Sequence, residues 1–229
     1  MLGGIKKGVI PMKPSILIQS FKQMWGIIKL EQKYKGKLPD KDSYSCSFKY
    51  SLPFQGIWTV VNGGEMQIDS HSWDIPTQRY AYDFIILDKN GKSFNGDETK
   101  PESFYCYGKE IFAPADGVVI EVSDWNPDSK ITVDRRAACA ARDIRGNYIL
   151  IHHAKDEYSL LAHLKPNSIN VSVGQRVNRG EKIALCGNSG NSSVNQTPNY
   201  ELFDNRKIQK EDINTYPPYI SRGQSVSNI

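Results

Sequence analysis

The sequence of 229 residues lacks several features that would assign it to a class at once. It has no dense run of Lys and Arg and a net charge of only +4, so an electrostatic nucleic-acid footprint is not expected. None of its four cysteines forms a C-x-x-C pair, which predicts isolated thiols rather than a zinc ribbon or a disulfide framework. It has four histidines, and none follows residue 163, which limits where imidazole ligands can lie.

Long apolar runs are also missing. The best candidate near the start, Val9 to Ile18, is interrupted by Pro11, Lys13 and Pro14, whereas a membrane span needs about 20 apolar residues. The same interruptions, and the lack of a small-residue cleavage site, argue against a signal peptide. We therefore expect no membrane span. A content of 39% hydrophobic and 24% charged residues is typical of a globular domain that needs no disulfide scaffold.

The first part of the chain has the spacing of an amphipathic helix. Its apolar positions recur three and four residues apart: Leu17, Phe21, Met24, Trp25 and Ile28. Pro14 precedes this stripe and Gly36 follows it, so we expect a helix from Ser15 to Tyr34 within an N-terminal helical segment, residues 1–45. We expect the stripe to pack on the rest of the chain; a membrane-surface or partner helix is the alternative.

Beyond Lys41 the pattern changes to short runs rich in Val, Ile, Tyr and Phe, separated by Gly, Asn, Asp and Pro, which is typical of strands and turns. The expected strands are residues 56–62, 80–87, 110–112, 117–122, 148–153, 158–164, 182–186 and 199–203. Because almost no helical period lies between them, we predict a mainly β fold with one compact domain, residues 46–205. The polar residues 206–229 predict a C-terminal tail on the surface or frayed.

Two polar residues stand out against this apolar pattern. Asp83 interrupts the run from Tyr80 to Phe84, and an ionised carboxylate in a buried strand needs a cation or hydrogen-bond donors to offset its desolvation. A structural carboxylate and a metal ligand are both open interpretations of Asp83. His163 ends the apolar run that begins at Leu160, where a hydrogen-bonded structural histidine is the main interpretation.

Several short segments follow one another in order between about Leu52 and Asp204. They are Ser70-His71, Tyr80-Ala81-Tyr82-Asp83-Phe84, Ala113-Pro114-Ala115-Asp116-Gly117-Val118-Val119, Gly146-Asn147-Tyr148, Ala162-His163-Leu164, Val173-Gly174-Gln175-Arg176-Val177 and Cys186-Gly187-Asn188-Ser189-Gly190. In this succession the chain resembles the lysostaphin-type, or LytM-like, zinc metallopeptidases. The resemblance implies a compact antiparallel β domain of the hybrid-motif kind, bound Zn²⁺, and hydrolysis of peptide bonds in bacterial cell-wall peptidoglycan. It also implies a location in the cell envelope or outside the cell.

The resemblance further implies roles for individual residues. His71 and Asp83 correspond to the first two zinc ligands of the family, and His163 to a histidine that assists the attacking water or the transition state. The family's terminal motif reads Pro-His-Leu-His-Phe, whereas this chain reads Pro-Asn-Tyr-Glu-Leu-Phe. Glu201 therefore stands where the third ligand is expected, and Asn199 where the second assisting histidine is expected.

These two replacements weaken the predicted zinc site. With Asp83 and Glu201 as ligands beside His71, two carboxylates neutralise the formal charge of Zn²⁺, so we expect reduced affinity and a weaker Lewis acid. Asn199 can donate a hydrogen bond but cannot carry a proton, which costs catalysis ~10²- to 10⁴-fold.

Two functional hypotheses remain open. The first is a metallopeptidase domain related to peptidoglycan endopeptidases, with weakened or lost activity. The second is a non-catalytic domain that binds a cell-wall peptide or regulates another wall hydrolase through the same cleft. A biotin- or lipoate-carrier domain is disfavoured, because the chain has no Met-Lys-Met turn to bear the cofactor.

Overall fold

Strands dominate the part of the chain that the computed structural model describes, which is residues 14–38, 43, 45–64, 66–131, 143–190, 199–203, 220 and 222–228. For residues 14–16, 19 and 199–203 it describes the backbone alone. The elements, in chain order, are α1 (Pro14–Tyr34), β1 (Trp58–Asn62), β2 (Ala81–Ile85), the 3₁₀ turn η1 (Pro101–Ser103), β3 (Glu110–Phe112), β4 (Gly117–Ser123), β5 (Asn147–Ala154), β6 (Glu157–Leu164), β7 (Arg176–Val177), β8 (Lys182–Leu185), β9 (Asn199–Phe203) and β10 (Ser225–Val226).

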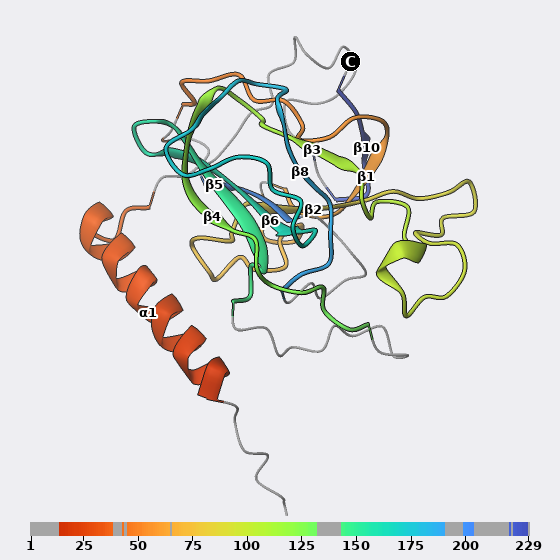
Figure 1. Ribbon diagram of the computed structural model, residues 1–229. Helices are drawn as coiled ribbons and strands as arrows, with labels where there is room; N and C mark the ends of the chain where they lie inside the picture. The colour runs from red at the N-terminus through yellow and green to blue at the C-terminus, as the bar shows by residue number, and fades with distance from the viewer. Residues whose placement is uncertain are drawn as a thin grey trace, which may run out of the picture.

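The strands form a large antiparallel sheet and a small one (Figure 1). The large sheet has the order β10-β1-β2-β9-β6-β5-β4-β7, and β3 pairs with β8 in the small sheet. Ile149 and Ile151 of β5 are buried in one cluster with Ile111 of β3 and Ile183 of β8. Burying each such side chain stabilises the fold by about 1.5–3 kcal/mol. The predicted fold class, mainly antiparallel β with an N-terminal helix, is confirmed.

The C-terminal residues that the structure describes differ from the expected surface tail. β10 pairs with β1 at the edge of the large sheet, with Trp58 opposite Val226, and the side chains of Ile220 and Val226 are buried. The side chain of Asn228 accepts a hydrogen bond from the backbone N–H of Leu52. The edge of β1 offers unpaired backbone groups, which a short strand can satisfy even when its own sequence is too short to show a β period.

Helix α1 has nearly the predicted bounds, but the prediction that its apolar stripe packs on the domain is wrong. Phe21 is 64% exposed and Trp25 is 61% exposed. The less exposed residues lie on the opposite side of the helix, around Ile27 and Leu30. Several of the β-domain's own apolar residues already fill its core, so the helix is not needed to close it. No helix within the described ranges combines the length and apolarity needed to cross a bilayer.

Two of the cysteines that are far apart in sequence lie together. Cys106 and Cys186 are both buried, and the backbone N–H of Gly108 donates to the carbonyl of Cys186 over 2.8 Å. Burial, together with a hydrogen bond to Cys106, raises the pKa of the Cys186 thiol. Neither of these two thiols is part of a disulfide, although the pairing of β3 with β8 joins segments that sequence spacing separates.

Candidate metal centre

Strand β2 carries Asp83 in the interior of the large sheet, between β1 and β9. All five residues of β2 are buried, and Asp83 is 3% exposed. Its Oδ2 accepts a hydrogen bond from Nδ2 of Asn62 over 2.8 Å, but its buried Oδ1 has no partner among the described residues. Burial raises the pKa of Asp83, against the opposing effects of His71 and Asn62. A buried carboxylate oxygen without a partner is costly and suits a site for a cation.

His71 lies beside this carboxylate. Its Nδ1 is 3.6 Å from Oδ2 of Asp83, and its side chain is 30% exposed, so it forms the solvent-facing side of the pair. The loop before it is held close to β2 at Gly63, whose N–H donates to the carbonyl of Asp69 over 2.8 Å. Gly63 has φ +115°, and a Cβ there would lie 2.5 Å from the Tyr82 side chain, so this approach requires glycine.

Strand β9 runs between β2 and β6 and brings the substituted terminal motif to the same part of the sheet. Its backbone register puts Asn199 opposite Asp83, and Glu201 opposite Ala81 on one side and Leu160 on the other. The side chains of Asn199 and Glu201 lie outside what the structure describes. Within the described residues there is no group of three or more His, Cys, Asp and Glu that could hold a metal ion.

His163 closes β6 in an unusual conformation. It is 3% exposed and has φ +58°, a left-handed backbone that non-glycine residues rarely adopt and that clusters at functional sites. Its Nδ1 lies 2.6 Å from the carbonyl oxygen of Ser189, and its backbone N–H donates to the carbonyl of Arg145. When Nδ1 donates to that carbonyl, the lone pair of the neutral ring is on Nε2.

The turn from Gly187 to Gly190 holds His163 in place. The hydroxyl of Ser189 donates to the carbonyl of Leu164 over 2.7 Å and accepts from the N–H of Asn147 over 2.8 Å. Asn126 in turn donates its backbone N–H to Oδ1 of Asn147. These groups are buried and mutually hydrogen-bonded, which makes the turn a rigid support rather than a loop for a ligand.

Sequence reasoning missed a charged cluster one hydrogen bond from His163. The guanidinium of Arg145 binds the Asp143 carboxylate through two nitrogens, at 3.1 and 2.8 Å, and lies 3.8 Å from the centre of the Tyr148 ring. Burial disfavours the ionised form of Asp143, but the hydrogen bonds from Arg145 outweigh it and lower the pKa of Asp143. The hydroxyl of Tyr148 donates to Glu121. In the sequence, only the motif Gly146-Asn147-Tyr148 marks this region, and that motif does not indicate an ion pair.

The burial of His163 predicts a pH-dependent stability. Burial lowers the pKa of His163 to about 4, from 6.5, so the unfolded chain binds a proton more readily than the folded protein between these values. We expect the free energy of unfolding to fall by about 2–3 kcal/mol from about pH 7.5 to 4.5. Urea unfolding at the two pH values measures this. His163→Gln should flatten the dependence. His152→Gln, at a half-buried position of β5, is the control and should keep it. An undiminished dependence in His163→Gln would contradict the assignment.

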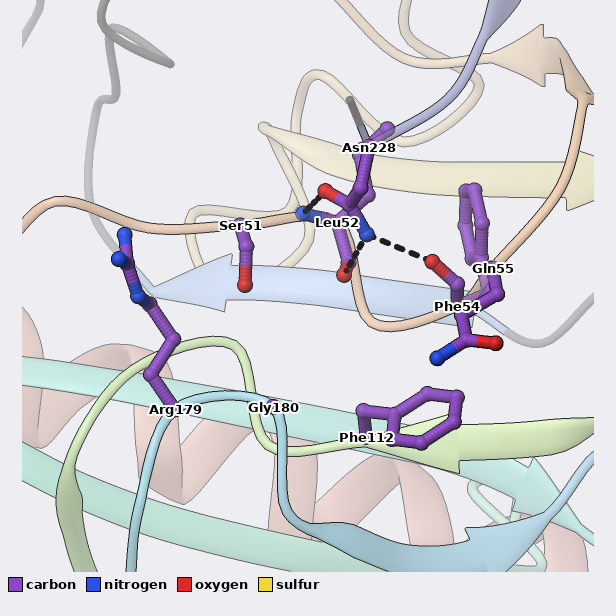
Figure 2. Close-up of a pocket in the computed structure, with 8 residues that line it drawn as sticks. All are labelled: Ser51, Leu52, Phe54, Gln55, Phe112, Arg179, Gly180 and Asn228. Carbon is purple, nitrogen blue, oxygen red and sulfur yellow. Dashed lines mark hydrogen bonds between the residues drawn. The ribbon is translucent and has the colours of Figure 1, made fainter. Parts of the chain in front are cut away.

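Figure 2 shows a pocket whose lining includes none of these residues. It has a volume of about 270 Å³ and is lined by Ser51, Leu52, Phe54, Gln55, Phe112, Arg179, Gly180 and Asn228. Asn228 helps to build it, since its amide donates to the carbonyls of Leu52 and Phe54. The lining contains no His, Cys, Asp or Glu, so this pocket offers no set of metal ligands, and the candidate centre remains the His71–Asp83 pair.

Residues 103–210 match the model of peptidase family M23. Among solved structures, the chain is similar to a Pseudomonas aeruginosa protein assigned to peptidase M23 (15% identity, 80% of this chain and 56% of that chain, TM-score 0.40). It is also similar to a zinc-containing peptidase from Vibrio cholerae (21% identity, 73% of this chain and 40% of that chain, TM-score 0.40). A third similar structure is the catalytic domain of the prophage-encoded M23 protein EnpA from Enterococcus faecalis (19% identity, 78% of this chain and 94% of that chain, TM-score 0.38). The chain thus spans about half the length of the first two.

Proposed function

We propose that the chain, whose residues 103–210 match the model of peptidase family M23, is a metallopeptidase domain that hydrolyses peptides of bacterial peptidoglycan weakly. The observation that carries the proposal is the buried Asp83. Its Oδ1 has no partner among the described residues, and His71 lies 3.6 Å from its Oδ2. An imidazole and a carboxylate at this separation are two donors of the kind that Zn²⁺ takes in proteins.

The residues present fit a divalent cation, which this site would bind with reduced affinity. His71 and Asp83 would bind it, and Glu201, in the strand paired with β2, would supply the third donor. A bound Zn²⁺ would polarise the scissile carbonyl and acidify a water molecule. Two carboxylates neutralise its formal charge, so both effects are smaller than with two imidazoles and one carboxylate.

The remaining residues provide only part of the proton chemistry of the family. His163 is neutral at neutral pH because burial lowers its pKa, and its ring is oriented by the Ser189 carbonyl. A neutral imidazole can accept a proton through Nε2 or hold a transition-state oxygen through a hydrogen bond. Asn199 can donate a hydrogen bond but cannot shuttle a proton. One proton carrier in place of two supports weak rather than full activity.

Hydrolysis of purified peptidoglycan by the full chain tests the proposal. We expect slow release of new amino groups that depends on added Zn²⁺, stops with a chelator, and is lost in Asp83→Asn, which removes a ligand charge without changing shape. Asp97→Asn, on an exposed loop, is the matched control and should keep the wild-type rate.

The outcome also decides between this proposal and the non-catalytic alternative. One feature favours that alternative: this chain has Asn199 where the resemblance implies a histidine. The site therefore lacks one proton carrier, while strand β9 keeps its place in the sheet. Binding of peptidoglycan without release of amino groups, in the presence of saturating Zn²⁺, would replace the peptidase proposal by a binding or hydrolase-regulating domain.

A further inference from the structure

Helix α1 turns a continuous apolar face to solvent. Six large side chains on that face are between 37% and 64% exposed: Leu17, Ile18, Phe21, Met24, Trp25 and Ile28. Their spacing of three and four residues puts them on one side of the helix. We call this set the outer stripe. In Figure 1, α1 lies along the outside of the β domain. Soluble proteins rarely expose apolar surface in one patch without a binding role.

Positive charge accompanies the outer stripe. Lys22, Lys29 and Lys33 follow one another at helical spacing along one flank, and Nζ of Lys29 lies 5.8 Å from the centre of the Trp25 ring. Residues 1–38 contain eight lysines and a single acidic residue, Glu31. The net charge of this segment therefore exceeds the +4 of the whole chain, and the remainder of the chain is slightly acidic.

An ion pair outside the outer stripe connects the helix with the β domain. Nζ of Lys33 forms an ion pair of 2.5 Å with Asp156, in the turn between β5 and β6. Gln23, Ile27, Leu30 and Tyr34 are less exposed than the outer stripe and lie on the opposite face. Neither the ion pair nor these less exposed residues involve the outer stripe, which stays exposed.

We propose that α1 binds the surface of an anionic phospholipid bilayer, with the outer stripe at the boundary of headgroups and acyl chains. A basic helix with Trp and Phe on its apolar face has the composition of interfacial helices, and lysines near the membrane plane are attracted to anionic headgroups. A second copy of this chain would meet the stripe with the same positive charge, which disfavours a symmetric dimer through this face. The binding surface lies outside the peptidase site and does not depend on the proposed catalysis.

Co-sedimentation of the full chain with lipid vesicles tests the proposal. We expect partitioning onto vesicles with about 30% phosphatidylglycerol to exceed that onto phosphatidylcholine alone by about tenfold or more, and to weaken as salt is raised. Phe21→Ala combined with Trp25→Ala should lower the partition coefficient by about tenfold or more. Lys22→Gln combined with Lys29→Gln should remove the preference for anionic lipid. Trp125→Ala is the matched control, since Trp125 is 63% exposed and lies in the loop after β4.

Three results would overturn the proposal. One is equal partitioning of the Phe21 and Trp25 double variant and the wild type. Another is equal partitioning onto anionic and neutral vesicles. The third is a dimer in sedimentation equilibrium that the double variant abolishes, which would assign the stripe to a second copy. Circular dichroism of each variant shows whether helix content is kept, so that lost binding is not confused with lost structure.

Discussion

Replacing Asn199 and Glu201 together by histidine is expected to produce a tighter zinc site and faster hydrolysis. The register places Asn199 of β9 opposite Asp83 of β2, and Glu201 opposite Ala81 of the same strand. Glu201→His exchanges a carboxylate for a neutral imidazole, so the bound ion keeps a net positive charge and acts as a stronger Lewis acid. Asn199→His supplies a second group that can carry a proton, in addition to His163. We expect hydrolysis of peptidoglycan to rise ~10²- to 10⁴-fold.

Calorimetric titration with Zn²⁺ and the amino-group assay measure the two effects separately. Glu201→His alone should raise metal affinity with a smaller gain in rate, whereas Asn199→His alone should change affinity little. A double variant that binds no more Zn²⁺ than the wild type would show that the site has diverged beyond these two positions. That result would support the non-catalytic domain.

Gly187→Ala is expected to cost more stability than a typical surface substitution. A Cβ at this position would lie 2.3 Å from the backbone N and Cα of Lys165, and backbone atoms cannot move aside as the end of a long side chain can. We expect a loss of about 3 kcal/mol or more in the free energy of unfolding, because the clash separates β8 from the end of β6.

Urea unfolding of purified variants measures this loss. Gly174→Ala is the control: Gly174 has φ +87° but no heavy atom within 4 Å of an added Cβ, so only backbone strain is expected, at about 1 kcal/mol. Similar losses in the two variants would mean that the contact with Lys165 relaxes and that the turn supporting His163 is softer than its packing indicates.

The alternation of apolar and polar residues predicted most of the fold. The bounds of β9 agree with the sequence prediction, β6 begins one residue earlier than predicted, and β5 is one residue longer at each end. The two-residue strands β7 and β10 were missed, because so short a run shows no period and depends on a partner strand for its existence. The helix was found by its spacing, but spacing cannot tell which of two apolar sides faces the domain.

The candidate site was less accessible to sequence reasoning. His71 and Asp83 were paired through a family resemblance, and the structure does bring them to 3.6 Å. Asp83 could be singled out on physical grounds alone, as a carboxylate in a buried strand. The ion pair of Arg145 with Asp143 could not be singled out in this way, because the backbone hydrogen bond that connects Arg145 with His163 exists only in the folded chain. The roles of Asn199 and Glu201 stay predictions, since their side chains lie outside the described residues.

The pairing of β10 with β1 has a consequence for the order of events during synthesis. Asn228 and Leu52 are 176 positions apart, yet their hydrogen bonds close the edge of the large sheet. Contacts over such separations form late, since the entropy of closing the loop must be offset first. The ribosome must therefore release the chain as far as β10 before β1 gains its outer neighbour. Until then the edge of β1 is open to other strands, so we expect the nascent chain to depend on chaperones and to be prone to aggregation at this edge.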